Sequence, residues 1–334
     1  MVSAVIFVAT SCVSPLTGFA FWETNLAYEG ESIYNYLQVK NLSDRMILST
    51  NVLFGVQSVT MKDKGLTGMY YDTALAAPAL ADNANSALIL GMGTGTYARQ
   101  LKQYYPKMNI TGVEIDQKIT DLAGEYFDEP ADIPVTTYDG RAWLAASHDK
   151  YDVIMVDAYQ DITIPFQMSS TEFFTMVREH LNPGGVMVVN MNMISDGQGS
   201  INEALSDTIA SVFGNGNTLT ADVPNTTNRE LFAKKPGSGS EENSMQQASK
   251  ALNLRETTYE RTGSEDLEWY MEEVTSRFRK VNEPDSASTI LTDDKAPVEV
   301  LGMHAIDQII ADEAGPYRQI LKDEGFGGLL RAVQ

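Results

Sequence analysis

The sequence has very few residues of the types that bind metals or form covalent cross-links. Among 334 residues there is one cysteine, Cys12, so no disulfide can form within the chain and a site of several thiolates is excluded. The histidines His148, His180 and His304 are far apart in the sequence and show no ligand spacing. We therefore expect neither a thiolate nor a histidine-rich metal site.

Positive charge is also scarce. Lys and Arg total 24 against 45 Asp and Glu, which gives a formal net charge of -21. Such a surface repels phosphate backbones, so we expect no nucleic-acid partner. It suits cationic ligands such as amines, although an acidic surface often serves only solubility. Hydrophobic residues make up 43% of the chain, which is enough for a folded core in one large domain or two modest ones.

The first 22 residues contain no charged side chain, and the first basic residue is Lys40. This segment therefore lacks the basic start of a secretory signal. Two interpretations of residues 1–22 stay open, a membrane anchor and a buried apolar element of the fold.

The remaining chain divides into three parts by pattern. Residues 23–78 form a β-rich module, since YNYLQVKN and RMILSTNVL have the alternation of strands. Residues 79–200 alternate strands and helices, and runs such as VIMV and VMVV are typical of strands buried on both faces. Residues 201–334 are a C-terminal extension that completes the fold. The pattern predicts an α/β protein with a doubly wound, Rossmann-like sheet of the class I methyltransferase type.

A glycine-rich turn follows the predicted strand ALIL. Gly91, Gly93 and Gly95 allow a tight turn and the close approach of a ligand to the backbone. Glu114 ends the next strand about 20 residues later, where a carboxylate can accept hydrogen bonds from ribose hydroxyls. The G-x-G-x-G spacing favours nucleosides of the S-adenosylmethionine type over dinucleotides. The alternative is a purely structural turn.

Two further acids end strands at the same predicted edge of the sheet. Asp139, followed by Gly140, is placed to accept a hydrogen bond from an adenine amino group, or to cap the helix that follows. Asp157 closes the apolar strand VIMV. A charge in that position needs a partner, for which a ligand amine is a candidate.

The order of GMGTGT, GVEID, YDGRAWL, YDVIMVDAY and TEFF resembles the polyamine aminopropyltransferase (spermidine synthase) family. The resemblance covers roughly residues 28–195. It is closest to a divergent branch in which such a domain follows a membrane-embedded region, because DAY, IPF and DDKAPVE also occur here.

The resemblance implies transfer of an aminopropyl group from decarboxylated S-adenosylmethionine to an amine such as putrescine, with release of 5′-methylthioadenosine and no metal. It implies a homodimer, either cytoplasmic or attached to a membrane with its catalytic domain in the cytoplasm. The implied catalytic residues are Asp157 and Tyr71. The implied donor-binding residues are Gln57, Gly91, Gly93, Gly95, Glu114, Asp139 and Gly140. The implied acceptor-binding residues are Tyr70, Asp72 and Tyr159, although helix packing alone would also explain the two adjacent tyrosines.

The sequence departs from the family pattern at two places. Thr94 stands where relatives have an acid in the glycine loop, and Gln160 stands where they have a second aspartate. Asp161 comes one residue late, and Asp293 or Asp294 is a candidate for the missing charge. Two alternatives therefore stay open: an N-methyltransferase that uses intact S-adenosylmethionine, and a nucleoside or polyamine sensor without catalysis. The acceptor amine is not specified.

Overall fold

The computed structural model describes residues 23–51, 56–159, 164–192, 199–237, 253–286, 288–304 and 322. The segment 1–22, for which we considered a membrane anchor, lies outside these residues, as do Gln160 and Asp161. Within the described ranges, no helix is both long and apolar enough to cross a bilayer.

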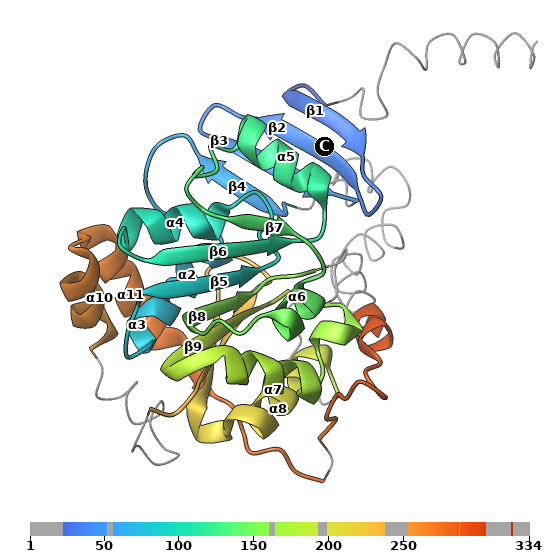
Figure 1. Ribbon diagram of the computed structural model, residues 1–334, viewed down its shortest axis with the longest axis vertical. Helices are drawn as coiled ribbons and strands as arrows, with labels where there is room; N and C mark the ends of the chain where they lie inside the picture. The colour runs from blue at the N-terminus through green and yellow to red at the C-terminus, as the bar shows by residue number, and fades with distance from the viewer. Residues whose placement is uncertain are drawn as a thin grey trace, which may run out of the picture.

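The N-terminal module is a four-stranded antiparallel sheet, at the top of Figure 1, with its strands in sequence order. The strands are β1 (Leu26–Glu31), β2 (Tyr36–Asn41), β3 (Arg45–Thr50) and β4 (Ser58–Met61). One face of this sheet packs Leu37, Val39 and Leu48 against two apolar residues of the large domain. These are Leu122 in the helix Gln117–Tyr126 and Phe127 directly after it. The small sheet is therefore joined to the rest of the molecule by an apolar contact.

The main domain is built on an eight-stranded sheet of order β12-β10-β11-β9-β8-β5-β6-β7. Its strands are β5 (Ser86–Leu90), β6 (Asn109–Glu114), β7 (Val135–Thr137), β8 (Tyr151–Val156), β9 (Leu181–Met191), β10 (Thr218–Asp222), β11 (Arg229–Lys234) and β12 (Phe278–Lys280). Strands β5 to β9 pair in parallel, and β10 to β12 add antiparallel pairs at one side.

Helices cover both faces of this sheet (Figure 1). They are α2 (Tyr70–Ala74), α3 (Ala76–Leu80), α4 (Thr96–Tyr104), α5 (Gln117–Tyr126), α6 (Gly140–Ala146), α7 (Thr171–His180), α8 (Ile201–Phe213), α10 (Leu254–Thr262) and α11 (Glu265–Arg277). Helices α2, α3, α4, α10 and α11 pack on one face, and α6, α7 and α8 on the other. The predicted α/β fold with a doubly wound, mostly parallel sheet is confirmed.

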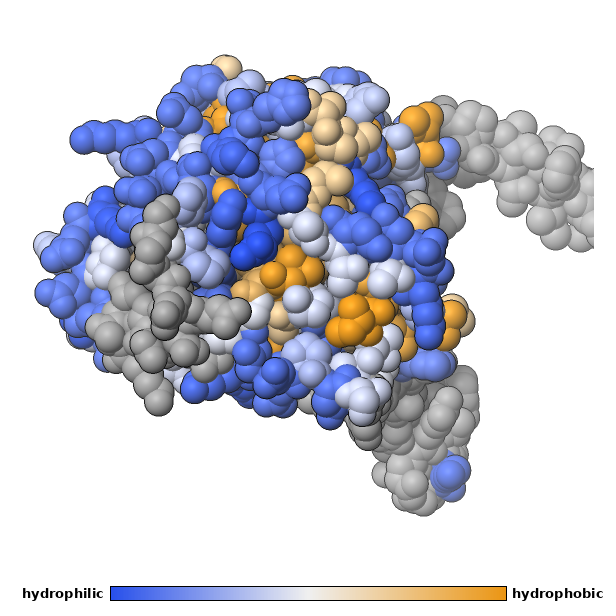
Figure 2. Space-filling model, turned by 60° about the horizontal axis from the view of Figure 1, so that its bottom comes forward, coloured by the Kyte–Doolittle hydropathy of each residue, from blue (hydrophilic) through white to orange (hydrophobic). Residues whose placement is uncertain are grey.

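One face of the molecule shows how polar and apolar residues are distributed on the surface. Most of the face in Figure 2 is hydrophilic, and its apolar residues gather near the middle.

The C-terminal extension contributes β10, β11 and β12 to the large sheet, so residues after 200 complete the same sheet. Of these strands, β12 is an exposed edge strand of three residues without the apolar run that marks β8.

Gly91 forms the sharp turn that ends β5. Its φ of 87° lies in the left-handed region that favours glycine. A Cβ at this position would lie 2.4 Å from the backbone oxygen of Asp157. The turn therefore brings the glycine loop against the end of β8, which no other residue type allows.

We expect Gly91→Ala to lower the free energy of unfolding by about 1–3 kcal/mol, because it adds backbone strain and a clash. The matched control is Gly124→Ala in the last turn of α5, where an added Cβ meets nothing within 4 Å. That change should raise stability by roughly 0.5–1 kcal/mol. Denaturant unfolding measures both, and equal effects of the two variants would contradict the account of this turn.

Candidate active site

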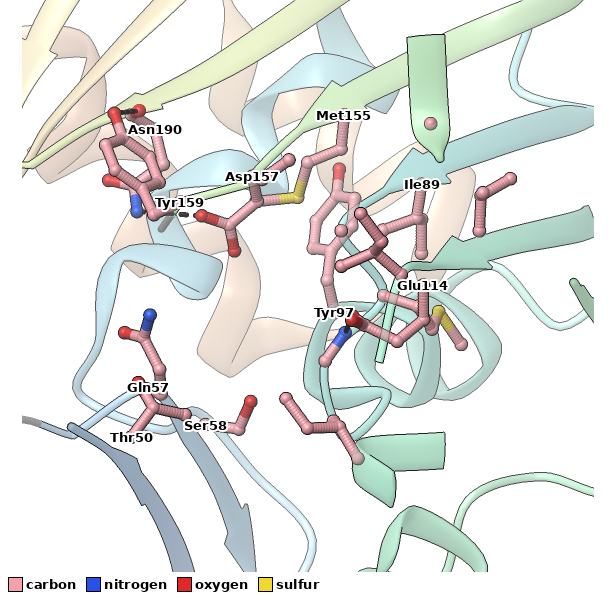
Figure 3. Close-up of a pocket in the computed structure, with 18 of the residues that line it drawn as sticks. Thr50, Gln57, Ser58, Ile89, Tyr97, Glu114, Met155, Asp157, Tyr159 and Asn190 are labelled. Carbon is pink, nitrogen blue, oxygen red and sulfur yellow. Dashed lines mark hydrogen bonds between the residues drawn. The ribbon is translucent and has the colours of Figure 1, made fainter. Parts of the chain in front are cut away.

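A cavity of about 350 Å³ opens at the carboxyl edge of the large sheet, facing the small sheet. Figure 3 shows Glu114 from β6, Asp157 from the end of β8 and Asn190 from β9 around it, with Gln57 on the opposite side. Its size is in the range of small-molecule sites. Ten residues predicted from the sequence line it: Gln57, Tyr70, Tyr71, Gly91, Gly93, Glu114, Asp139, Gly140, Asp157 and Tyr159.

Glu114 is fixed at the end of β6 by two backbone groups. The N–H of Gly93 donates to Oε2 at 2.8 Å, and the N–H of Asp116 donates to Oε1 at 3.0 Å. Burial raises the pKa of Glu114, while these backbone donors oppose the shift. Each carboxylate oxygen keeps a second lone pair, so Glu114 can also accept hydrogen bonds from a bound ribose.

Asp139 caps helix α6. Its Oδ1 accepts a hydrogen bond from the backbone N–H of Ala142 at 2.7 Å. Asp139 and Gly140 nevertheless line the cavity, beside the half-exposed ring of Tyr138. Asp139 therefore caps the helix through Oδ1, as one of the two interpretations predicted. Its position at the cavity is also compatible with a contact to adenine.

Asp157 projects into the cavity from the end of β8. Its Oδ1 accepts from Asn190 Nδ2 at 3.0 Å, and its Oδ2 accepts from the Tyr70 hydroxyl at 2.7 Å. Burial raises the pKa of Asp157 to about 7, although these two hydrogen bonds favour the charged form. Asp157 is therefore suited to accept and release a proton near neutral pH.

The three tyrosines at the site have different partners. Tyr70 contacts Asp157, whereas the hydroxyl of the neighbouring Tyr71 donates to the backbone oxygen of Gln57 at 2.8 Å. Tyr159 donates to the backbone oxygen of Asn190. The family resemblance implied a catalytic role for Tyr71, which stays a prediction. In the structure the tyrosine hydroxyl that donates to Asp157 is that of Tyr70.

Asp72 and Gly95, both predicted as site residues, do not line the cavity. Asp72 is fully buried and accepts from the backbone N–H groups of Thr67 at 2.9 Å and Gly68 at 2.7 Å. It therefore holds the turn before α2 and has no free face toward a substrate. Gly95 begins α4 with a φ of 79° and contributes to the shape of the loop.

Sequence reasoning missed Asn190, which is 4% exposed and orients Asp157. Asn228 in turn donates to Asn190 Oδ1 at 2.9 Å. The only sequence signal was the position of Asn190 at the end of VMVV, a run that predicted a buried strand.

Thr94, which replaces the acid of the glycine loop, and Asp293 and Asp294, the candidates for the missing charge, do not line the cavity. Thr94 is fully buried and does not line the cavity. Asp293 binds Arg141 through both carboxylate oxygens, at 2.8 and 2.6 Å, and accepts from Ser170. Across the described ranges there is no cluster of three or more acidic, histidine or cysteine side chains that would hold a metal ion.

Comparison with known proteins agrees with this geometry. Residues 69–235 match the sequence profile of the spermine/spermidine synthase domain. A curated protein of Bifidobacterium longum, named "Probable polyamine aminopropyl transferase", is 99% identical over all 334 residues, and the chain spans 75% of its length. A polyamine aminopropyltransferase of Vibrio vulnificus is 28% identical over 209 residues, which is 60% of this chain and 69% of that protein.

The fold also matches a solved structure. A probable spermidine synthase from Corynebacterium glutamicum superposes with a TM-score of 0.55 at 20% identity, over 79% of this chain and 99% of that one. At this identity the likeness concerns the fold, and it agrees with a Rossmann-like, methyltransferase-type sheet.

We expect Glu114→Ala to weaken binding of 5′-methylthioadenosine by about 2 kcal/mol, which is about thirty-fold, because charge-assisted hydrogen bonds to the ribose are lost. Calorimetric titration measures the affinity. The control is Glu125→Ala on the exposed side of α5, which should bind normally. Unchanged affinity in the Glu114 variant would remove the ribose assignment.

We expect Tyr70→Phe to raise the pKa of Asp157 by about one unit, because the carboxylate loses a hydrogen bond that favours its charged form. Tyr71→Phe should leave that pKa nearly unchanged, since the Tyr71 hydroxyl donates to Gln57. Carbon-13 NMR titration of the aspartate carboxyls tests the pair. Equal shifts in both variants would show that the contact seen at Tyr70 does not control Asp157.

Proposed function

The chain belongs to the spermine/spermidine synthase family, and from this premise we propose that it transfers an aminopropyl group from decarboxylated S-adenosylmethionine to an amine, releasing 5′-methylthioadenosine. One observation carries the proposal: Asp157 and Glu114 line the same cavity. Burial raises the pKa of Asp157 to about 7, and Glu114 is the residue that we propose to bind the ribose.

The donor lies with its adenosine against the glycine loop. Glu114 binds the ribose, and Asp139 and Gly140 lie beside the adenine. Gln57, which directly precedes β4, faces them across the cavity. In the proposed complex it contacts the rest of the donor. This arrangement directs the sulfonium toward the end of β8, where Asp157 projects into the cavity.

The transfer is a displacement at the propyl carbon next to sulfur. The lone pair of the acceptor nitrogen forms the new C–N bond while the C–S bond breaks. The electron pair of the broken C–S bond stays on sulfur, so the sulfonium becomes a neutral thioether. The acceptor must be uncharged when it attacks. Asp157 accepts its proton and later releases it to solvent. Asn190 and Tyr70 orient the carboxylate, and alignment of the reacting atoms supplies much of the remaining rate.

Putrescine is the acceptor that we propose. Its amine lies at Asp157, and its alkyl chain packs along the rings of Tyr70 and Tyr159, which line this end of the cavity. The assembly as a homodimer and the membrane attachment through residues 1–22 stay predictions.

Product analysis by mass spectrometry tests the reaction. With putrescine as acceptor, 5′-methylthioadenosine and spermidine should form from the decarboxylated donor. Formation of S-adenosylhomocysteine from intact S-adenosylmethionine would identify a methyltransferase instead. Binding of both substrates without any product would identify a sensor.

We expect Asp157→Asn to lower kcat by at least about a hundred-fold, because the amide cannot accept the proton from the amine. Affinity for 5′-methylthioadenosine should stay within about two-fold, since the ribose contacts are untouched. Asp149→Asn, at an exposed position just before β8, is the matched control and should keep full activity. Full activity in the Asp157 variant would exclude this residue as the base.

A further inference from the structure

A second buried acid lies two strands from Asp157, outside the mechanism above. Glu230 on β11 is fully buried, and within the described part of the chain neither of its carboxylate oxygens has a hydrogen-bond partner. An unpartnered carboxylate in such a place costs several kcal/mol, so a protein keeps one only where something offsets that cost.

The strand register places Glu230 beside the catalytic acid. Glu230 pairs directly with Asn190 across β11 and β9. Val156 pairs with Val189, so the next residues along these parallel strands, Asp157 and Asn190, are also neighbours. Asp157, Asn190 and Glu230 therefore form a row across the sheet. Directly paired residues have Cβ atoms about 5 Å apart.

All three side chains of this row point to the same face of the sheet. Residues two positions before or after them on the same strands, Met155, Val188 and Phe232, belong to the core under α2 and α4. Alternation along a strand then puts Asp157, Asn190 and Glu230 on that face as well. This is also the face on which the cavity opens, since Met155 and Asn190 line it.

Among the residues that the structure describes, the charged group found to act on Glu230 is the acid Asp157, and no cation acts on it. Tyr97 from α4, Tyr159 from the loop after β8 and Asp157 interact with it electrostatically. On β10 its partner is Ala221. From α2, Asp72 faces the turn at Thr67 and Gly68. Burial and the negative charge of Asp157 raise the pKa of Glu230 well above its usual value, so both favour the protonated carboxyl while no cation is bound.

The proposed substrates bring the missing positive charge. The donor carries a sulfonium and an ammonium group, and putrescine carries two ammonium groups. Of the described acids, Glu114, Asp139 and Asp157 line the cavity. Of these, Asp157 becomes neutral when it takes the proton from the amine. In a buried site, a charge still attracts a bound cation strongly when it lies a few ångströms beyond the residues that line the cavity.

We propose that Glu230 is a second acid of the amine end of the site, which holds a proton while the cavity is empty and loses it to solvent when the cationic substrates are bound. This role rests on the proposed function. It makes Glu230 a positioning residue that stabilises the bound cations through its charge, without touching them, and it couples amine binding to proton release.

Titration calorimetry tests the coupling. Putrescine is titrated into protein saturated with 5′-methylthioadenosine at pH 7.5, in buffers of different ionisation enthalpy, which gives the number of protons released. Glu230→Gln should release fewer protons than wild type, by up to one per site, and should bind putrescine about ten-fold more weakly. The control is Asp207→Asn, a buried acid on α8 whose pKa burial also raises, and it should behave as wild type.

Thermal unfolding without ligands gives a second, independent measurement. Because the pKa of Glu230 is higher in the folded than in the unfolded protein, wild type loses stability as the pH rises above the unfolded value. Glu230→Gln lacks this loss. The Tm of the variant relative to wild type should therefore rise between pH 5 and pH 8, whatever constant offset the substitution itself causes.

The outcomes separate this proposal from the proposed function. If wild type binds putrescine, but Glu230→Gln releases as many protons and binds as tightly, Glu230 has no role at the amine end. A Tm difference that is independent of pH would show that Glu230 is already ionised in the empty protein, which also overturns the proposal. If wild type binds no putrescine at all, the amine-transfer function itself is wrong, and this role falls with it.

Discussion

A carboxylate at the end of a buried strand needs hydrogen-bond donors from its neighbours to offset the cost of burial. The site depends on how the neighbours of Asp157 supply these hydrogen bonds. Asn190 and Tyr70 each donate one hydrogen bond to it. These bonds orient the carboxylate but do not cancel the effect of burial, so its pKa stays near 7. The same burial that costs stability thus makes Asp157 an effective base at neutral pH.

The cavity also depends on the small sheet, which forms one of its walls. The Tyr71 hydroxyl binds the backbone oxygen of Gln57, and Thr96 Oγ1 donates to the backbone oxygen of Val59 at 2.8 Å. These bonds tie the start of β4 to α2 and α4, next to the glycine loop. The donor-binding loop, the proton acceptor and the wall formed by the small sheet are therefore positioned by one connected set of contacts, with Tyr70 and Tyr71 at its centre.

Much of this arrangement could be predicted from the sequence, because strong local patterns encode it. The apolar runs VIMV and VMVV predicted parallel strands, and glycine and acid positions after strands predicted the residues at their ends. Contacts between distant segments could not be predicted. The choice between Tyr70 and Tyr71 depends on the rotation of a five-residue helix, and the role of Asp72 depends on a turn at Thr67 and Gly68. Glu230 gains its neighbours only through strand register.

The most direct test of the account is the pH dependence of a single turnover with saturating donor and putrescine. If Asp157 must be ionised to take the proton from the amine, the rate should fall about ten-fold per pH unit below a midpoint near 7 and level off above it. A rate that stays constant between pH 5 and pH 9 would contradict the assignment of Asp157 as the base.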